Sequence, residues 1–154
     1  MRFTTKAEYG FVCLIYMAKQ TSKNWVTVKE IAEKEHFSAT YIEKIMQALR
    51  GANIVTSHHG KEGGYSLARP PSAINLRQVI EALEGHTFEV FCEPELRENI
   101  VCTHFCMCGI SSIWEKTKKI LDDFFTSMTL ETLVKEKEEK ESLHMKGLMV
   151  NENE

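Results

Sequence analysis

No apolar run in this sequence approaches the roughly 20 residues that a membrane span requires. The first residues, Met1–Lys6, also lack the apolar core of a signal peptide and lead directly into a helical pattern. A hydrophobic fraction of 43% with 27% charged residues is typical of a soluble globular chain. We therefore expect a cytoplasmic protein that does not associate with a membrane.

The motifs of several enzyme classes are missing as well. The chain has no phosphate-binding glycine loop followed by a helix, no Gly-x-Ser-x-Gly elbow and no His-Glu-x-x-His motif. Its glycine-rich run, residues 60–64, lacks the Lys-Ser or Lys-Thr pair that a nucleotide site needs. We therefore expect that the protein is not an enzyme.

The chain has 154 residues, a length that suits one domain with a helical extension. Charge is divided unevenly along it. The net charge is −3, but residues 1–85 carry a balance of +3 and residues 86–154 a balance of −6. A basic first half can meet phosphates, whereas an acidic second half would be repelled by them.

Apolar spacing predicts a mainly α fold with one small β-hairpin. Four helices are expected at 4–20, 38–50, 75–85 and about 111–128. A short helix is expected to begin with a capping box at 27–30, and a last helix is expected to begin at 129 and to lose its helical pattern in the charge run 135–141. The expected strands are 54–57 and 65–68, which flank a polar tip. Three helices followed by a hairpin are the order of a winged helix-turn-helix. The longest helix then follows as an addition to that fold.

The physics of a winged helix-turn-helix suits duplex DNA, because its third helix enters the major groove and its hairpin touches the backbone or the minor groove. Hydroxylated residues at the start of the helix allow close approach to phosphates, and Glu43 can accept from a cytosine amino group. The candidate DNA-binding residues are Arg2, Ser38, Thr40, Tyr41, Glu43, Lys44, Arg50, His58, His59 and Lys61. The alternative is a protein-interaction module without salt-dependent DNA affinity.

The longest expected helix carries apolar residues in a 3-4-3-4 seam and in a second stripe beside it. This apolar surface is wider than one small domain can cover, so we expect a homodimer. The candidate dimerisation residues are Ile113, Ile120, Leu121 and Phe124. Four units follow: a DNA-binding domain at 1–85, a cysteine-rich loop at 86–109, the dimerisation and C-terminal helices at 110–141, and a disordered tail at 142–154.

The five cysteines are clustered. Cys13 stands alone in the first expected helix and is interpreted as a small buried hydrophobe. The other four lie within 17 residues, at Cys92, Cys102, Cys106 and Cys108. In a reducing cytoplasm such a cluster indicates a metal or redox site rather than a disulfide framework. An iron–sulfur cluster, a zinc ion or a cluster-free thiol switch each fit this pattern.

Several motifs resemble the IscR/NsrR/RirA/CymR family of winged-helix regulators over about residues 1–134, most specifically in the first 85. These motifs are Met1-Arg2-Phe3-Thr4 with Tyr9, Ser38-x-x-Tyr41-Ile42-Glu43-x-Ile45-x-x-x-Leu49-Arg50, Gly60-x-x-Gly63-Gly64-Tyr65-x-Leu67-Ala68, and Ile74-x-Leu76-x-x-Val79-Ile80-x-Ala82-x-Glu84-Gly85. The resemblance implies a dimeric repressor or activator that binds a double-stranded DNA operator and is built around the long helix.

The resemblance also implies an iron–sulfur cluster, [2Fe-2S] or [4Fe-4S], because many members of the family hold one with three cysteines just before the long helix. Cys92, Cys102 and Cys108 match those ligands best. Such a cluster would set operator affinity by sensing redox state, nitric oxide or iron–sulfur status. The alternatives are a winged-helix regulator that uses a cysteine thiol switch, zinc or a small effector.

The fourth ligand stays open, because Ser111 stands where the family has a ligating histidine. Nitric-oxide-sensing relatives use an acidic residue at the position of Glu8, delivered from the partner subunit. Glu8 can instead form a capping box with Thr5 at the start of the first helix. The candidate fourth ligands are Cys106, Glu8 and His104.

Overall fold

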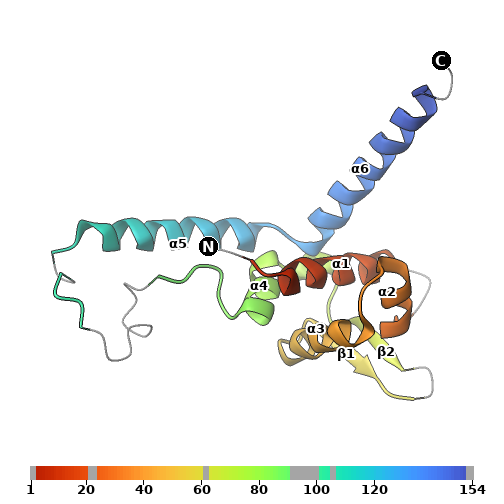
Figure 1. The fold of residues 1–154 in the computed structure, drawn as a ribbon, viewed down its shortest axis with the longest axis horizontal. Helices are drawn as coiled ribbons and strands as arrows, with labels where there is room; N and C mark the ends of the chain where they lie inside the picture. The colour runs from red at the N-terminus through yellow and green to blue at the C-terminus, as the bar shows by residue number, and fades with distance from the viewer. Residues whose placement is uncertain (1–2, 21–23, 61–62, 91–100, 105–106, 152–154) are drawn as a thin grey trace.

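Helices dominate the computed structural model, and a single antiparallel hairpin accompanies them in the part of the chain that is described (Figure 1). The elements are α1 (Thr5–Lys19), α2 (Val28–Glu35), α3 (Ala39–Gly51), β1 (Val55–His58), β2 (Gly64–Leu67), the 3-10 helix η1 (Pro71–Ala73), α4 (Leu76–Glu84), α5 (Gly109–Ser127) and α6 (Leu130–Asn151). The described residues are 3–20, 24–60, 63–90, 101–104 and 107–151, with side chains as far as 146. The mainly α fold with a small hairpin is confirmed.

The helix-turn-helix is built from local signals. Thr27 and Glu30 form the expected capping box, so each satisfies a free backbone N–H at the start of α2. His36 ends α2 in the left-handed region, with φ of 57°, and this reverses the chain toward α3. Ser38 occupies the N-cap position of α3, as expected, although its side chain makes no capping hydrogen bond.

The start of α1 differs from the expected capping box of Thr5 with Glu8. Thr4 is the N-cap, and its hydroxyl accepts from the backbone N–H of Lys6. Thr5 is therefore the first residue inside the helix, and Glu8 lies one position beyond the reach of a capping box. Glu8 is exposed and carries no capping role in this structure.

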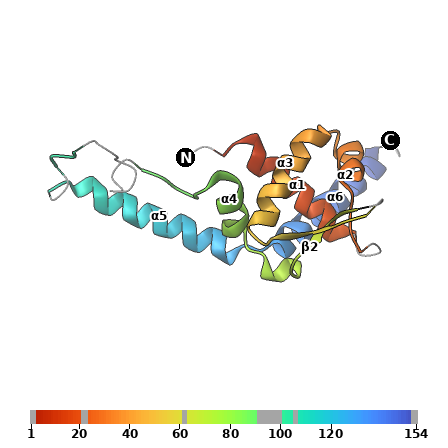
Figure 2. The ribbon, with the colours of Figure 1, turned by 90° about the horizontal axis from the view of Figure 1, so that it is seen from below.

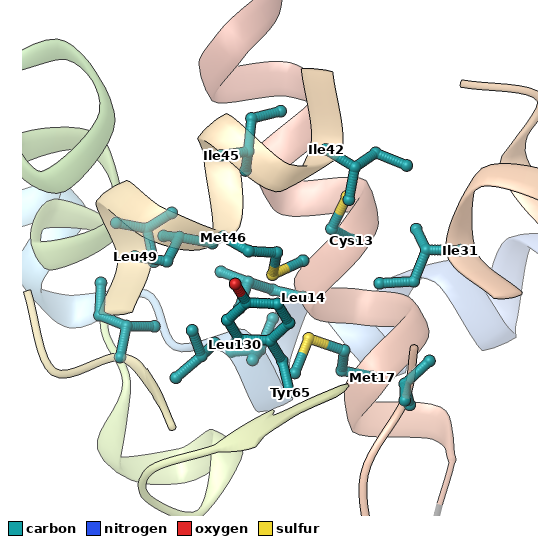
Figure 3. Packing of buried hydrophobic residues seen from close by; sticks show 14 of the residues in the cluster. Cys13, Leu14, Met17, Ile31, Ile42, Ile45, Met46, Leu49, Tyr65 and Leu130 are labelled. Atoms are coloured by element: carbon teal, nitrogen blue, oxygen red, sulfur yellow. The ribbon is translucent and has the colours of Figure 1, made fainter. Parts of the chain in front are cut away.

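A single hydrophobic core joins α1, α3 and the base of the hairpin (Figure 3). The stripe expected on the third helix faces this core, and none of its side chains is exposed to solvent: Ile42, Ile45, Met46 and Leu49. Leu14 from α1 and Leu130 from α6 lie in the same cluster. Because these residues are spaced by three and four along α3, the opposite face of that helix is left to solvent.

The hairpin is tied to the helical body by a short additional strand contact. β1 pairs antiparallel with β2, with Val55 opposite Leu67 and His58 opposite Gly64. Val26 forms an isolated bridge with Tyr65, and its N–H and carbonyl both bond to the backbone of that residue at 2.8 Å. The segment that precedes α2 therefore fixes the hairpin, which is the wing, against the helical body through β2.

The two C-terminal helices leave the body in different directions (Figures 1 and 2). No residue of α5 is buried, and the helix extends from α4 as an arm. The chain then returns to the body, because the N–H of Leu130 bonds to the carbonyl of Ile74 at 2.8 Å and the N–H of Leu76 to that of Met128 at 2.9 Å. The first turn of α6 therefore completes the core of the winged body.

The last helix is longer than the sequence indicated. The charge run 135–141 was expected to end it, with a disordered tail from 142, but α6 continues to Asn151. Lys135 pairs with Glu131 one turn earlier at 3.0 Å, and Glu141 pairs with Lys19 of α1 at 2.7 Å. Pairs four apart stabilise a solvated helix, and a contact with another element adds to them. Residues 152–154 of the expected tail lie outside the described residues.

Candidate DNA-binding face and cysteine segment

The outer face of α3 carries polar side chains because its other face fills the core. The exposed candidates on or beside this helix are Ser38, Thr40, Lys44 and Arg50. The guanidinium of Arg50 donates to the hydroxyl of Ser57 at 3.4 Å, which directs it along β1. Arg50 therefore lies beside the wing, and the other three candidates are exposed at or on α3.

Tyr41 is less available than the sequence implied. Its ring meets Tyr9 edge to face, with centroids 5.7 Å apart, and Tyr9 stacks on Phe37 at 3.8 Å. The hydroxyl of Tyr41 lies 3.4 Å from that of Thr5. The half-buried ring thus belongs to an aromatic cluster that holds the start of α3 against α1.

Glu43 is engaged by the wing. The Tyr65 hydroxyl on β2 donates to Oε1 of Glu43 over 2.8 Å. Burial and this bond raise the pKa of Tyr65 above its usual value, so the phenol remains a donor at neutral pH. The sequence suggested Glu43 as a reader of cytosine, but it did not reveal this partner 22 positions away.

Of the two histidines in the wing, one is exposed and the other packs against neighbouring side chains. His59 is exposed, whereas His58 stacks on Trp25 with centroids 5.2 Å apart, and its Nε2 lies 2.8 Å from the hydroxyl of Ser66. His58 therefore packs against Trp25 and β2 rather than facing solvent at the tip. Two further candidates for DNA contact, Arg2 and Lys61, lie outside the described residues.

The cysteine segment contributes two described thiols. Cys102 and Cys108 are free and half-buried, and Cys108 is the N-cap residue of α5. Cys92 and Cys106 lie outside the described residues. Among the described residues no three possible ligands gather at one point, and His104 is exposed. Two soft thiol donors fit a thiophilic metal or an iron–sulfur cluster in kind.

The fold also bears on Glu8, a candidate fourth ligand, and on Cys13, the cysteine of α1. Within one chain, α1, which carries Glu8, lies in the body, while residues 101–104 and Cys108 lie at the end of α5 that is far from the body (Figures 1 and 2). A ligand role for Glu8 would therefore require a second subunit. Cys13 is fully buried, and burial raises the pKa of its thiol to about 12. The interpretation of Cys13 as a buried hydrophobe is confirmed.

A polar junction joins the winged body to α5. Thr87, a buried polar residue, donates from its hydroxyl to Oδ1 of Asp122, and Oδ2 of Asp122 lies 3.5 Å from a nitrogen of Arg77 on α4. Phe88 contacts Trp114 of α5, with ring centroids 6.0 Å apart. No sequence pattern indicated this junction, because its partners lie 26 to 45 positions apart.

The apolar seam of α5 is open to solvent in the single chain. Ile113, Ile120 and Phe124 are 53%, 67% and 54% exposed, while Leu121 is half-buried. Large apolar side chains in a row along one helix are typical of a contact with another chain.

Within the described residues, no helix is both long and apolar enough to cross a membrane.

Comparisons with known proteins agree with this architecture. A family model described as Rrf2, iron-dependent transcriptional regulator, matches residues 3–136. Protein rrf2 of Nitratidesulfovibrio vulgaris is 32% identical over 136 residues, which cover 88% of this chain and 89% of the relative. The winged helix-turn-helix protein described here belongs to the Rrf2 family of transcription regulators.

Two solved structures of regulators in this group superpose on the chain. CymR of B. subtilis, described as its global cysteine regulator, has a TM-score of 0.70 and 28% identity, covering 88% of this chain and 97% of CymR. IscR of T. potens has a TM-score of 0.68 and 30% identity, covering 91% of this chain and 90% of IscR. The winged-helix architecture is thereby confirmed.

Proposed function

We propose that this chain is a homodimeric, DNA-binding transcription regulator that places α3 in the major groove and the wing against the backbone. The observation that carries the proposal is the exposed polar face of α3 beside the wing, in a chain of a transcription-regulator family. Lys44 and Arg50 supply cations on that face, and Ser38 and Thr40 supply hydroxyl groups close to the start of the helix.

The salt dependence of binding tests this placement. A DNA operator is selected from a random library with the wild-type protein, and its affinity is measured over a range of salt. Lys44→Ala should weaken binding to all sequences and reduce the salt slope by about one, because one phosphate contact is lost. Lys135→Ala removes the same charge from α6 and should leave both quantities unchanged. Wild-type behaviour of the Lys44 variant would contradict the placement of α3.

The second part of the proposal is that an iron–sulfur cluster held by Cys92, Cys102 and Cys108 sets operator affinity. Two of these thiols are free and half-buried. When bound, such a cluster supplies a redox- or nitric-oxide-labile group. The chain's own residues give the loop an influence on DNA binding, because one end is tied to α5 through Thr87 and the other end opens α5 at Cys108.

Only a modest energetic bias is needed for such control. A tenfold change in operator affinity corresponds to about 1.4 kcal/mol. A ligand can shift the arrangement of the two DNA-binding bodies by no more than its differential affinity for the two arrangements. Several thiolate bonds within one loop can supply a bias of this size.

Anaerobic purification with an absorption spectrum, iron and sulfide analysis tests the cluster. Alanine at any one of Cys92, Cys102 or Cys108 should weaken or abolish the chromophore and alter operator affinity. A colourless, iron-free protein from iron-replete cells would overturn the cluster. If oxidants still changed the DNA affinity of that iron-free protein, a cluster-free thiol switch would be the better explanation. Stoichiometric zinc would instead indicate a zinc-dependent regulator.

A further inference from the structure

The contact between the wing and the recognition helix has a defined geometry. Tyr65 is only 7% exposed, and both its backbone N–H and its carbonyl bond to Val26 at 2.8 Å. Its phenol reaches from β2 to Oε1 of Glu43 on α3, at 2.8 Å. Because the backbone of Tyr65 is fixed, the hydroxyl is a rigid donor to a side chain that would otherwise rotate.

This bond leaves Glu43 with spare acceptor capacity. An ionised carboxylate has two oxygens with about four acceptor positions, and the phenol uses one of them. Glu43 is half-buried at the boundary between the core face and the solvent face of α3. Its remaining acceptor positions are therefore open to a further donor on the side of α3 that borders the wing.

We infer that Tyr65 is a specificity-determining residue, which holds the Glu43 carboxylate in one orientation so that it accepts from the amino group of a cytosine in the major groove. The inference rests on the proposed function, since it requires α3 to lie in that groove. Cytosine N4 is a donor in the major groove, and glutamate is a suitable acceptor for it. Tyr65 itself does not touch the base.

The physical reason is preorganisation. A free glutamate loses rotational freedom when it binds a base, and this loss lowers the net gain from the correct contact. The phenol removes most of that freedom before DNA arrives. It also couples base reading to the wing, because Tyr65 lies on β2 while Glu43 lies on α3.

The test compares three variants and one control variant on the operator selected by the wild type and on all of its single base-pair substitutions. Tyr65→Phe removes only the hydroxyl. We expect its preference for cytosine at one position in each half-site to fall by about threefold to tenfold, the net value of one typical hydrogen bond, with the salt slope unchanged. Tyr16→Phe removes a phenol hydroxyl from α1 and should match the wild type.

Glu43→Ala identifies the base pair concerned, because it should lose preference at that same position. Glu43→Gln provides a second, independent check, since the introduced amide can still accept from Tyr65 but offers the base a donor. We expect it to shift the preferred base rather than merely weaken binding. Circular dichroism and thermal melting establish that each variant is folded.

Different results would overturn different statements. If Glu43→Ala altered base preference and Tyr65→Phe did not, Tyr65 would have no part in specificity, although the DNA-binding proposal would stand. If Tyr65→Phe lowered affinity equally for every sequence, the bond would be only a support for the wing, and the inference would be wrong. If the wild type selected no operator at all, the proposed function itself would fail.

Discussion

At the scale of single residues, Gly64 is a position where the wing packs tightly against the backbone of Val26. A Cβ built on Gly64 would collide with the carbonyl of Val26, which is backbone and cannot rotate away. Gly64→Ala should therefore break the bridge between Val26 and Tyr65, with a loss of about 1–3 kcal/mol in the free energy of unfolding. Chemical denaturation measures this loss, and operator affinity should fall with it.

Gly51→Ala is the matched control for that substitution. A Cβ at Gly51 meets nothing within 4 Å, and the residue is exposed at the last position of α3. Alanine there should leave stability unchanged or raise it by about 0.5–1 kcal/mol, because it reduces the entropy of the unfolded chain. Equal destabilisation by both substitutions would contradict the close approach at Gly64.

Cys13 should behave as a core residue rather than as a redox group. Its pKa is about 12 in the folded state and 9.0 in the unfolded reference. The raised pKa stabilises the fold fully below pH 9, and this contribution declines as the pH rises from 9 toward 12, since the unfolded chain releases the proton first. Alkylation at pH 8 followed by mass spectrometry should modify Cys13 only after unfolding.

Cys13→Ala supplies the functional side of that prediction. The variant should retain the chromophore and operator affinity, with a loss of about 1–2 kcal/mol in the free energy of unfolding from the small cavity. Rapid alkylation of Cys13 in the native protein, or loss of the chromophore in this variant, would contradict its placement in the core.

At the scale of elements, the junction of α4 with α5 depends on Asp122. This residue accepts from Thr87 and faces Arg77, and it is only 14% exposed. Asp122→Ala leaves a buried hydroxyl without its partner, so we expect a loss of about 1–3 kcal/mol. Amide hydrogen exchange in α5 should accelerate, and limited proteolysis should cut more readily after α4.

The neighbouring residue Asp123 gives a direct comparison. It is 67% exposed and pairs with Lys119 one turn away, at 3.0 Å. An exposed pair contributes little, so Asp123→Ala should change stability by less than about 0.5 kcal/mol and leave the exchange of α5 as it is. If the two variants behaved alike, the junction would not anchor α5.

At the scale of the whole molecule, we predict a symmetric homodimer through the apolar seam of α5. Phe124→Glu or Ile120→Glu should yield a monomer with unchanged helix content, because a charge at the centre of such an interface is left unpaired. Sedimentation at micromolar concentration distinguishes the two states. Binding to a palindromic operator should weaken in parallel, since one DNA-binding body then acts alone.

The control for that experiment lies on the last helix. Leu143 on α6 is 67% exposed, the same fraction as Ile120. Leu143→Glu should remain a dimer if the seam of α5 is the interface. A wild-type monomer at micromolar concentration, or dissociation by the Leu143 variant alone, would count against this assembly.

The sequence determined those features of the molecule that are encoded over one or two turns. The spacing of Ile42, Ile45 and Met46 indicated the buried face of α3, and the caps at Thr27 and Asn75 set where α2 and α4 begin. Such patterns depend on the local helical period and on backbone groups a few positions away. The winged fold and the exposed candidates on α3 follow from them.

Only the tertiary structure decided which distant groups meet. Glu43 and Tyr65 are 22 positions apart, Thr87 and Asp122 are 35 apart, and Leu130 enters a core made mainly by α1 and α3. Contacts of this kind depend on how whole elements pack, so no local period encodes them. The length of α6 was likewise decided by a distant contact. Its charge run by itself is typical of the end of a helix, but the ion pair between Lys19 and Glu141 adds a contact with α1.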